Sequence, residues 1–407
     1  MIENNLSMSK QGHLPTLIAS FLHFDLSFML WVMLGALGIY IAESLNLDPA
    51  QKGLMVAVPI LSGALFRLPL GLLSDRYGSK IIGTLMLGFL FVPLTIGWLA
   101  PNNLSTMLAT GLMLGTAGAS FSVALPLASR WYPANRQGLV MGIAAAGNSG
   151  TAIANLLAPL LANSFGWKNV LGLAMIPLAL VLIAFILMAK DSPAQIKGQP
   201  LRKLFGSLKN KDVLWFCLFY SVTFGGYVGL CSFLPLFWRD QYQVTPFSAG
   251  YLTALAAVTG SLIRPIGGWL ADKVGGVRML LVLFICLGGL YFFESRLPEL
   301  SLMIGLMVLT TLCLGLGNGA VFQLVPQQFD KEIGVVTGVV GAVGGFGGFL
   351  LPILLGNIKA ATGSFAFGLL VLSIAAFSAL LLLVILTVTS DVWKVTWQQK
   401  IKLQEAL

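Results

Sequence analysis

The chain has 407 residues, of which 57% are hydrophobic and only 10% are charged, and its mean hydropathy is +0.89. No soluble domain hides so large an apolar fraction in its core, so the composition excludes a soluble protein and indicates one that lies in a bilayer. The net charge of +9 does not call for nucleic acid as a partner, because Lys and Arg accumulate in the cytoplasmic loops of membrane proteins. Membrane lipid is the expected surrounding.

Apolar runs of about 20 residues, the length that crosses roughly 30 Å of hydrocarbon, recur along the chain between short polar turns. We therefore expect an all-α, polytopic membrane protein with twelve transmembrane helices. The residues before the first run are polar and lack the apolar core of a signal peptide, so that run is expected to be retained. The expected spans are 17–41, 51–74, 80–100, 103–129, 137–162, 168–189, 213–237, 247–271, 278–294, 301–327, 334–358 and 364–389.

The distribution of basic residues predicts the orientation in the membrane. With the N-terminus inside, seventeen of the 24 Lys and Arg residues fall on the cytoplasmic side, five fall outside and two lie within spans. Since positive charge is retained in the cytoplasm, we expect a multi-pass protein of the cytoplasmic (inner) membrane with both termini in the cytoplasm.

A long polar interruption divides the expected spans six and six. It runs from Ala189 to Asp212 and is rich in Lys, Pro and Gly, which is typical of a linker. The expected organisation is a cytoplasmic N-terminal segment (1–16), an N-terminal six-helix bundle (17–189), a cytoplasmic linker (190–212), a C-terminal six-helix bundle (213–389) and a cytoplasmic C-terminal tail (390–407).

The two halves repeat one pattern. "FRLPLGLLSDRYG" (66–78) and "IRPIGGWLADKVG" (263–275) each set an arginine within an apolar run, eight residues before an aspartate. An even number of spans separates the copies, so the halves have parallel topology. The pairs, each separated by 197 residues, are Arg67 and Arg264, Gly71 and Gly268, Asp75 and Asp272, and Gly78 and Gly275.

"GLLSDRYGSK" (71–80) and its echo "GWLADKVGGVR" (268–278) resemble the loop motif between helices 2 and 3 of the major facilitator superfamily. The resemblance implies two six-helix halves around a site at the membrane midplane. The residues that match the motif are Gly71, Asp75, Arg76, Gly78, Gly268, Asp272 and Lys273.

Further stretches resemble one family within that superfamily. "GIAAAGNSGTAIANLLAP" (142–159) and "GVVGAVGGFGGFLLP" (338–352) are similar to the paired glycine-rich signatures of the nitrate/nitrite porters, and "FLHFDLSFMLW" (21–31) is similar to their first helix. The resemblance implies a secondary active transporter of nitrate and/or nitrite. It also implies that Arg67 and Arg264 bind the anion and that Phe121, Tyr220 and Phe224 line the site.

Physical chemistry supports an anion site at the two arginines. Eight residues of helix place each about 12 Å inside the membrane from its aspartate, where insertion costs about 2.5–3.5 kcal/mol. Asp25 is the only acid well within a span and the nearest charged candidate, and one carboxylate cannot neutralise both. A planar oxyanion such as nitrate or nitrite suits the guanidinium fork. Two alternatives stay open, namely arginines bonded to backbone carbonyls and a larger organic anion.

Other polar and small residues are candidates for supporting roles. Asn148 is expected to donate an amide N–H to the anion, whereas Asn318 is as easily explained by a hydrogen bond between helices. The signature glycines are expected to let helices approach and slide during alternating access, with static packing as the alternative. These glycines are Gly147, Gly150, Gly338, Gly341, Gly344, Gly345, Gly347 and Gly348.

Asp25 is also the best-placed group to couple transport to protons, with His23 two residues away on a different helix face. The sequence favours proton symport over nitrate/nitrite exchange, and a polar packing residue is the alternative role for Asp25.

No feature of the sequence predicts an enzyme. His13 and His23 are the only histidines and the four cysteines lack metal-ligand spacing, so neither a metal site nor a cofactor is expected. Nor does the chain contain the phosphate-binding glycine motif of ATP-driven transporters. The alternative function is a major facilitator carrier or efflux pump for a small organic anion. A monomer is expected, because one chain supplies the whole pathway.

Overall fold

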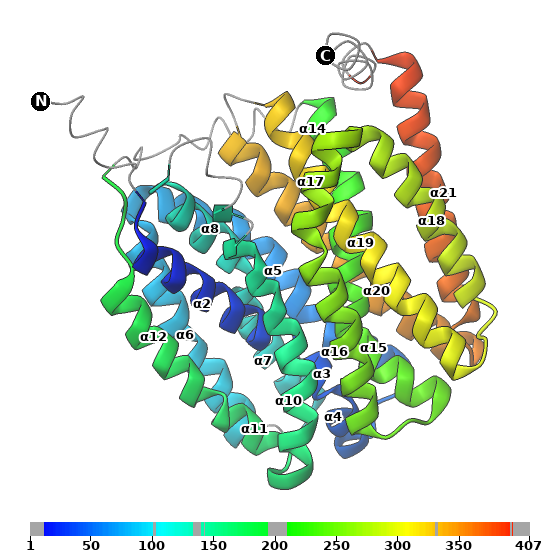
Figure 1. Ribbon diagram of the computed structural model, residues 1–407. Coiled ribbons are helices and arrows are strands. Elements are labelled where there is room, and N and C mark those ends of the chain that lie inside the picture. Colours follow the sequence, from blue (N-terminus) through cyan, green and yellow to red (C-terminus); the bar gives the residue numbers. More distant parts are fainter. Residues whose placement is uncertain are drawn as a thin grey trace, which may run out of the picture.

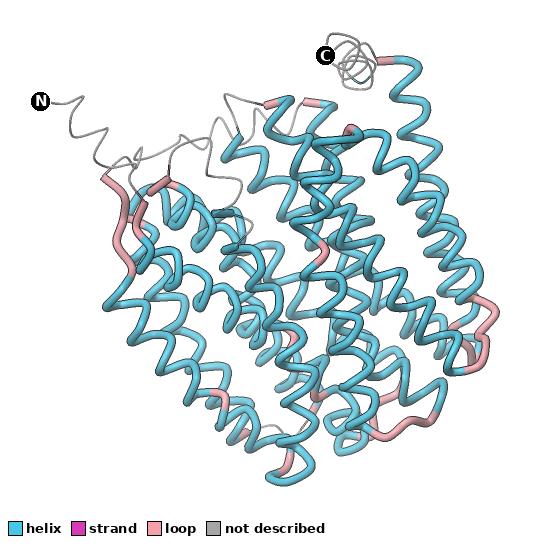
Figure 2. The backbone as a smooth tube through the Cα atoms, in the orientation of Figure 1, coloured by secondary structure: helices cyan, strands magenta, loops and turns pink. Residues whose placement is uncertain are grey.

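The computed structural model describes residues 12–100, 103–132, 140–141, 143–193, 210–329, 333–390 and 393. In this part of the chain every regular element is a helix, and the helices lie side by side in one bundle (Figure 1). Figure 2 shows the helices joined by short loops, with no strand among the described residues. The expectation of an all-α membrane fold is confirmed.

The helices of the first half occupy the left and centre of Figure 1, in blue to green. Three of its elements are short: two 3₁₀-helices, and one four-residue α-helix that lies between two longer helices. In chain order the elements are α2 (Leu14–Trp31), α3 (Met33–Ala36), α4 (Gly38–Leu45), α5 (Pro49–Tyr77), α6 (Ser79–Leu99), α7 (Leu104–Leu114), the 3₁₀-helix η1 (Gly115–Ser120), α8 (Phe121–Ser129), the 3₁₀-helix η2 (Ala146–Ser149), α10 (Gly150–Phe165), α11 (Trp167–Leu173) and α12 (Met175–Met188).

The second half lies on the right of the same view, in green to red. It holds the longest helix of the described chain, α20, and one π-helical turn. Its elements are α14 (Lys211–Tyr220), the π-helix η3 (Ser221–Gly225), α15 (Gly226–Tyr242), α16 (Pro246–Leu262), α17 (Arg264–Val274), α18 (Gly276–Glu294), α19 (Leu300–Gln328), α20 (Ile333–Thr362) and α21 (Ala366–Thr389).

Eleven helical segments of the described chain are long and apolar enough to cross a membrane. Each coincides with one of the expected spans. In the remaining expected span, 137–162, residues 137–139 and 142 lie outside the described residues; residues 140–141 and 143–145 are helical, and η2 and α10 follow them. Most of the expected linker, at 194–209, and all of the expected tail except 390 and 393 also lie outside them.

Helix ends differ from the expected boundaries where local capping extends the helix. The span expected at 51–74 is the longer helix α5, because Asp48 and Gln51 form a reciprocal capping box at its start. At its other end the backbone leaves helical geometry at Gly78, whose φ is +104°. Gly275 ends α17 in the same way with a φ of +96°, a conformation that glycine adopts without steric cost.

Several expected spans are not continuous α-helices. The first is divided into α2, α3 and α4 at Val32 and Leu37. Another is divided into α16 and α17 just before Pro265, which has no N–H with which to continue the hydrogen-bond ladder. The 3₁₀ and π segments interrupt further spans, and two of these breaks adjoin the arginines described below.

The loop motifs tie each half together on one side, the upper side in Figure 1. Asp75 accepts a hydrogen bond and forms an ion pair with Arg130, which ends the helix after η1. In the second half, Asp272 accepts a hydrogen bond of 2.9 Å from Gln323 of α19. These contacts stay within their own halves, so they do not join one half to the other.

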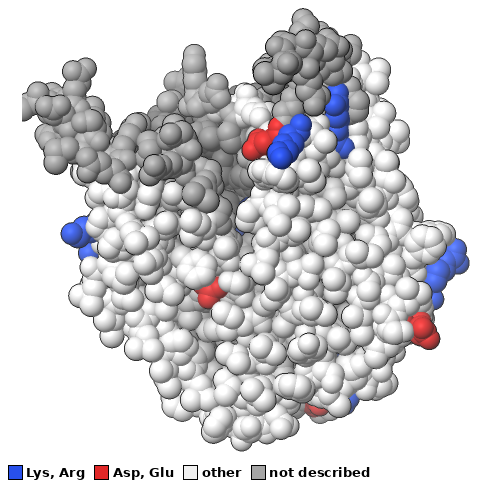
Figure 3. Space-filling view, in the orientation of Figure 1, with Lys and Arg blue, Asp and Glu red and all other residues white. Residues whose placement is uncertain are grey.

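The remaining motif residues pack locally. Arg76 lies over the ring of Tyr77 at 5.3 Å, and Lys273 lies over the ring of Trp269 at 3.8 Å. Figure 3 shows that the visible face of the bundle carries its Lys and Arg at the rims, with a single acidic patch in the otherwise uncharged middle. Such a belt is what a helix bundle presents to lipid.

Candidate functional site

Arg67 lies between the two halves and is 1% exposed. Its Nε donates a hydrogen bond of 3.1 Å to the carbonyl of Gly118, in η1. Its Nη1 donates to the carbonyl of Gly341, on α20 of the other half. Its Nη2 has no partner in the described structure. The guanidinium group therefore joins both halves through carbonyls and keeps one buried nitrogen unpaired.

Arg264, at the start of α17, is 8% exposed. Its Nη2 donates to the hydroxyl of Tyr220 at 3.2 Å, and its Nη1 lacks a partner among the described residues. No ion pair of the described chain includes either arginine. Each of the two buried guanidinium groups thus has one nitrogen without a hydrogen-bond partner, and neither is bonded to a carboxylate in the described chain.

One aromatic stack touches both arginines. The rings of Tyr220 and Phe224 are parallel, with centroids 4.9 Å apart and an interplanar angle of 2°. Tyr220 bonds to Arg264, while the guanidinium of Arg67 lies 4.8 Å from the Phe224 centroid. Both rings are fully buried. Phe224 belongs to the π-helix η3, which begins directly after Tyr220, and the wider turn of η3 sets the relative position of the rings.

Each arginine also lies against a phenylalanine from a corresponding helix. Arg67 lies 5.4 Å from the ring centroid of Phe121, and Arg264 lies 5.6 Å from that of Phe322. The two phenylalanine rings are 5.8 Å apart. Trp31 adds a further face, 5.5 Å from Arg67. Cation–π attraction at such distances stabilises a guanidinium group that has no carboxylate beside it.

Sequence reasoning missed Phe322 and Trp31. A signal for Phe322 is present, because "GASF" (118–121) and "GAVF" (319–322) repeat a Gly-Ala-x-Phe pattern in the two halves. No comparable signal marks Trp31. Its indole donates to the carbonyl of Pro59 at 2.8 Å, which fixes the ring beside α5.

The two asparagines are buried in different surroundings. Asn148, in η2, and Asn318, in α19, are each 1% exposed, and the Oδ1 atom of each lacks a hydrogen-bond partner in the described part of the chain. No hydrogen bond among the described residues joins either side chain to Arg67 or Arg264. A role for Asn148 at the anion site stays a prediction.

Asp25 is not among the groups that contact the arginines. It is half-buried on α2 and accepts a hydrogen bond of 2.6 Å from Ser149. Its backbone packs against the first glycine signature, since a Cβ atom at Gly147 would lie 2.8 Å from the Asp25 nitrogen. The nearest acidic candidate from the sequence is therefore held by a serine of its own half.

The two glycine signatures serve different contacts. In the first, Gly147 and Gly150 face α2 of the same half, and Gly142 lies outside the described residues. In the second, Gly341 and Gly345 face the first half across the boundary, and Gly348 lies between Ile60 of α5 and Gly225 of its own half. Gly344 and Gly347 face Tyr220 and Ser221 of their own half. Gly338 is nearest to Leu68 of α5, with a hypothetical Cβ 3.7 Å from its side chain.

Comparison with known proteins places the chain in a family. The model of the Major Facilitator Superfamily matches residues 17–352. The chain belongs to this superfamily. It is 34% identical to the nitrite extrusion protein of Bacillus subtilis over 379 residues, which cover 92% of each chain.

Two further relatives are similar over most of their length. A probable nitrate/nitrite antiporter of Thermus thermophilus is 32% identical over 393 residues, 88% of each chain. A probable nitrate transporter of Staphylococcus epidermidis is 30% identical over 358 residues, 88% of this chain and 92% of the relative. The resemblance to the nitrate/nitrite porters is confirmed, and the protein is a membrane carrier rather than an enzyme.

The different contacts of the two signatures predict different defects for one substitution. In Gly345→Leu, a side chain enters the boundary where a Cβ would already lie 3.0 Å from Ala64. We expect folded protein whose transport falls at least tenfold, because the halves cannot move past each other. In Gly147→Leu the clash is with the α2 backbone, so the folded yield should fall instead.

Size-exclusion chromatography and uptake into liposomes measure the two effects separately. Gly289→Ala is the matched control, since a Cβ at Gly289 meets nothing within 4 Å. Normal transport by folded Gly345→Leu would contradict a moving contact at this glycine.

Proposed function

We propose that the protein transports nitrate and/or nitrite across the cytoplasmic membrane by alternating access, with the anion held between Arg67 and Arg264. The relatives include a nitrite extrusion protein, a probable nitrate/nitrite antiporter and a probable nitrate transporter, and their names support this substrate class. One chain supplies both arginines, so a monomer contains the complete site.

The unpaired nitrogens of the two arginines carry the proposal. Arg67 Nη2 and Arg264 Nη1 are buried donors without acceptors in the described chain. A buried polar group without a partner costs free energy, and a charged group costs more. A small oxyanion would accept from both donors and supply negative charge at the same time, which offsets both costs.

The aromatic faces around the arginines support a small, planar ligand. The guanidinium carbon of Arg67 lies within 6 Å of the rings of Phe121 and Phe224, and that of Arg264 lies within 6 Å of the ring of Phe322. Tyr220 stacks on Phe224, and Phe121 contacts Phe322. Apolar walls lower the local dielectric and strengthen charge-assisted hydrogen bonds to the anion. They also crowd out bulky groups, which favours nitrate or nitrite over the alternative of a small organic anion.

The carbonyl partners of Arg67 bear on the alternative of a purely structural arginine. Two carbonyls satisfy Nε and Nη1, and one of them, on Gly341, belongs to the other half. Because α20 turns its glycines toward α5 at this point, movement of α20 would change this bond. We propose that Arg67 exchanges the Gly341 carbonyl for the anion as the halves reorient.

The coupling of transport has two proposed modes. Proton symport through a side chain requires a titratable group, for which Asp25 is the candidate. Asp25 bonds to Ser149 and forms no ion pair with an arginine in the described chain, so a proton there would act on the anion only indirectly. The second proposed mode is exchange of one anion for another, and the position of Asp25 away from the arginines favours it.

Lysine substitutions test the proposed anion site. Arg67→Lys or Arg264→Lys keeps the charge and removes the fork that meets two oxygens. Each lost charge-assisted hydrogen bond costs about 1.5–3 kcal/mol, so nitrate should bind more than tenfold more weakly to either variant. The double variant should be non-additive, because both side chains act on one ligand.

Calorimetric titration of folded protein with nitrate measures these affinities, with Arg296→Lys as a control on an exposed arginine that stacks on Phe292. Near-normal affinity in both single variants would refute the two-arginine site. Reduced folded yield with normal affinity would instead show arginines that only hold helices together.

Transport by liposomes distinguishes the coupling modes. If Asp25 carries the proton, Asp25→Asn should abolish nitrate uptake driven by a pH gradient and leave nitrate/nitrite counterflow intact. Ser149→Ala is the control, because it removes the hydrogen bond and keeps the carboxylate. Unchanged pH-driven uptake in Asp25→Asn would exclude Asp25 as the carrier, and uptake that needs an internal anion would establish exchange.

A further inference from the structure

A buried histidine lies directly behind the part of the site that holds Arg67. His23, on α2, has no exposed surface. One ring nitrogen, Nδ1, lies 2.7 Å from the hydroxyl of Ser120, and the other, Nε2, lies 3.2 Å from the carbonyl of Gly83. The ring thus joins α2, α6 and η1, three elements that are distant in the chain.

The partners of His23 determine the direction of both hydrogen bonds. A carbonyl only accepts, so in the neutral ring Nε2 carries the hydrogen and donates to Gly83. Nδ1 then accepts, and the Ser120 hydroxyl donates to it. Every polar atom of the imidazole is satisfied, and the Ser120 hydroxyl does not turn back to its own helix.

The bond to Ser120 holds the segment that contacts Arg67. Ser120 ends η1, in which the Gly118 carbonyl accepts from Arg67 Nε at 3.1 Å. The next residue, Phe121, places its ring 5.4 Å from the same guanidinium. A 3₁₀ segment has poorer hydrogen-bond geometry than an α-helix, so an outside contact matters for its position.

We propose that His23, through Ser120, is a positioning residue that fixes the Gly118 carbonyl and the Phe121 ring and thereby orients Arg67 for the anion. This role rests on the proposed function. A positioning role differs from general packing, because it predicts a loss of nitrate affinity that depends on the guanidinium group of Arg67.

Ser120→Ala removes the donor to His23 and should weaken nitrate binding severalfold in folded protein, measured by calorimetry. The effect should largely vanish when Arg67 is already lysine, a non-additivity that marks shared action. Ser20→Ala and Ser27→Ala are matched controls on α2, since both hydroxyls are buried and unbonded in the described chain. His23→Gln gives a second variant if Ser120→Ala does not fold.

Normal affinity in folded Ser120→Ala and His23→Gln would overturn the positioning role, as would an equal loss in the Arg67→Lys background. Failure of the proposed function looks different, because the unmodified protein would then not bind nitrate at all.

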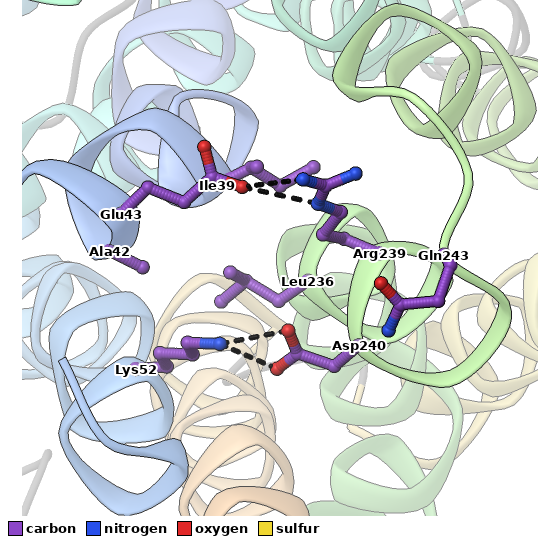
Figure 4. A pocket seen from close by; sticks show the side chains of 8 residues that line it. All are labelled: Ile39, Ala42, Glu43, Lys52, Leu236, Arg239, Asp240 and Gln243. Atoms are coloured by element: carbon purple, nitrogen blue, oxygen red, sulfur yellow. Dashed lines mark hydrogen bonds and ion pairs between the residues drawn. The ribbon is translucent and has the colours of Figure 1, made fainter. Parts of the chain in front are cut away.

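An independent observation concerns the opposite end of the boundary between halves. On the lower side in Figure 1, Lys52 of α5 donates to both carboxylate oxygens of Asp240 on α15, each at 2.8 Å. Arg239 of α15 donates to Glu43 of α4 through Nε at 3.1 Å and through Nη2 at 3.0 Å. Figure 4 shows the two ion pairs on either side of Leu236 in one small pocket.

These are the ion pairs that join the two halves within the described chain, since the third, Asp75–Arg130, stays within the first half. Each half contributes one acid and one base, which are adjacent in α15 (Arg239 and Asp240) and lie on the successive helices α4 and α5 in the first half (Glu43 and Lys52). If α15 slid so that Arg239 approached Lys52, two positive charges would repel each other. The charge pattern therefore favours one alignment of the two halves.

Close backbone packing accompanies the ion pairs. A Cβ at Gly35 would lie 3.1 Å from the Ser232 carbonyl carbon, and one at Gly53 would lie 3.2 Å from the Gly356 Cα. These contacts join the halves on the same side and must be lost when that side opens. A contact that forms in just one of two states shifts the equilibrium toward that state by the free energy of the contact.

We propose that Lys52–Asp240 and Arg239–Glu43 form a charged latch that holds this side closed and biases the carrier toward access from the other side. Part-exposed ion pairs are individually weak, so the latch adjusts the balance between the two access states without locking one of them.

A reporter cysteine tests the latch without any substrate. Ile60→Cys places a thiol on α5 at a position that is 1% exposed and packs against Gly348 of the other half. A membrane-impermeant thiol reagent is added to intact cells and, separately, to inside-out vesicles. The same protein without Ile60→Cys corrects for the four native cysteines.

Lys52→Ala and Asp240→Ala should each raise labelling from the latch side up to about fivefold, the range of a part-exposed ion pair. The exchange Lys52→Asp with Asp240→Lys should restore the low rate. Lys168→Ala, a cation of the same side that stacks on Trp167 rather than joining the halves, should have no effect. Unchanged labelling in both single variants, or no recovery in the exchange, would overturn the latch.

Discussion

Positive charge buried without a bonded carboxylate is the constraint on which the rest of the site depends. Arg67 and Arg264 are 1% and 8% exposed, and the described chain pairs neither with an acid. Carbonyl oxygens, a tyrosine hydroxyl and aromatic faces supply partial negative charge in place of a full one. These groups offset part of the desolvation cost and leave one nitrogen of each arginine free, which suits a ligand that must bind and leave.

The two halves meet this constraint in different ways although they repeat one sequence pattern. Arg67 bonds to carbonyls from both halves, whereas Arg264 bonds to a side chain of its own half. Arg67 is therefore the arginine whose hydrogen-bond partners lie in both halves. The Tyr220–Phe224 stack connects the two environments, and the π-helical turn beside it gives this connection a backbone of unusual geometry.

Charge is arranged differently at the two sides of the bundle. On the upper side, the loop motifs use Asp75 and Asp272 to brace neighbouring helices within one half. On the lower side, Lys52 and Arg239 reach acids of the opposite half. In the proposed alternating-access cycle, contacts within a half would persist as rigid bodies reorient and contacts between halves would not, so the second kind would change the relative free energy of the access states.

The sequence by itself determined the membrane class, eleven of the twelve expected spans and the repeat, because hydropathy over 20 residues and a spacing of 197 residues are local or internal properties of the chain. It placed Arg67, Arg264, Tyr220, Phe224 and Phe121 as candidates, and these five do lie together. The tertiary structure decided that Asp25 bonds to Ser149, that Trp31 and Phe322 complete the aromatic surroundings, and that Glu43 meets Arg239. Such contacts join residues on different helices, from 36 to 196 positions apart. Their geometry follows from how broken helices cross, which no local pattern records.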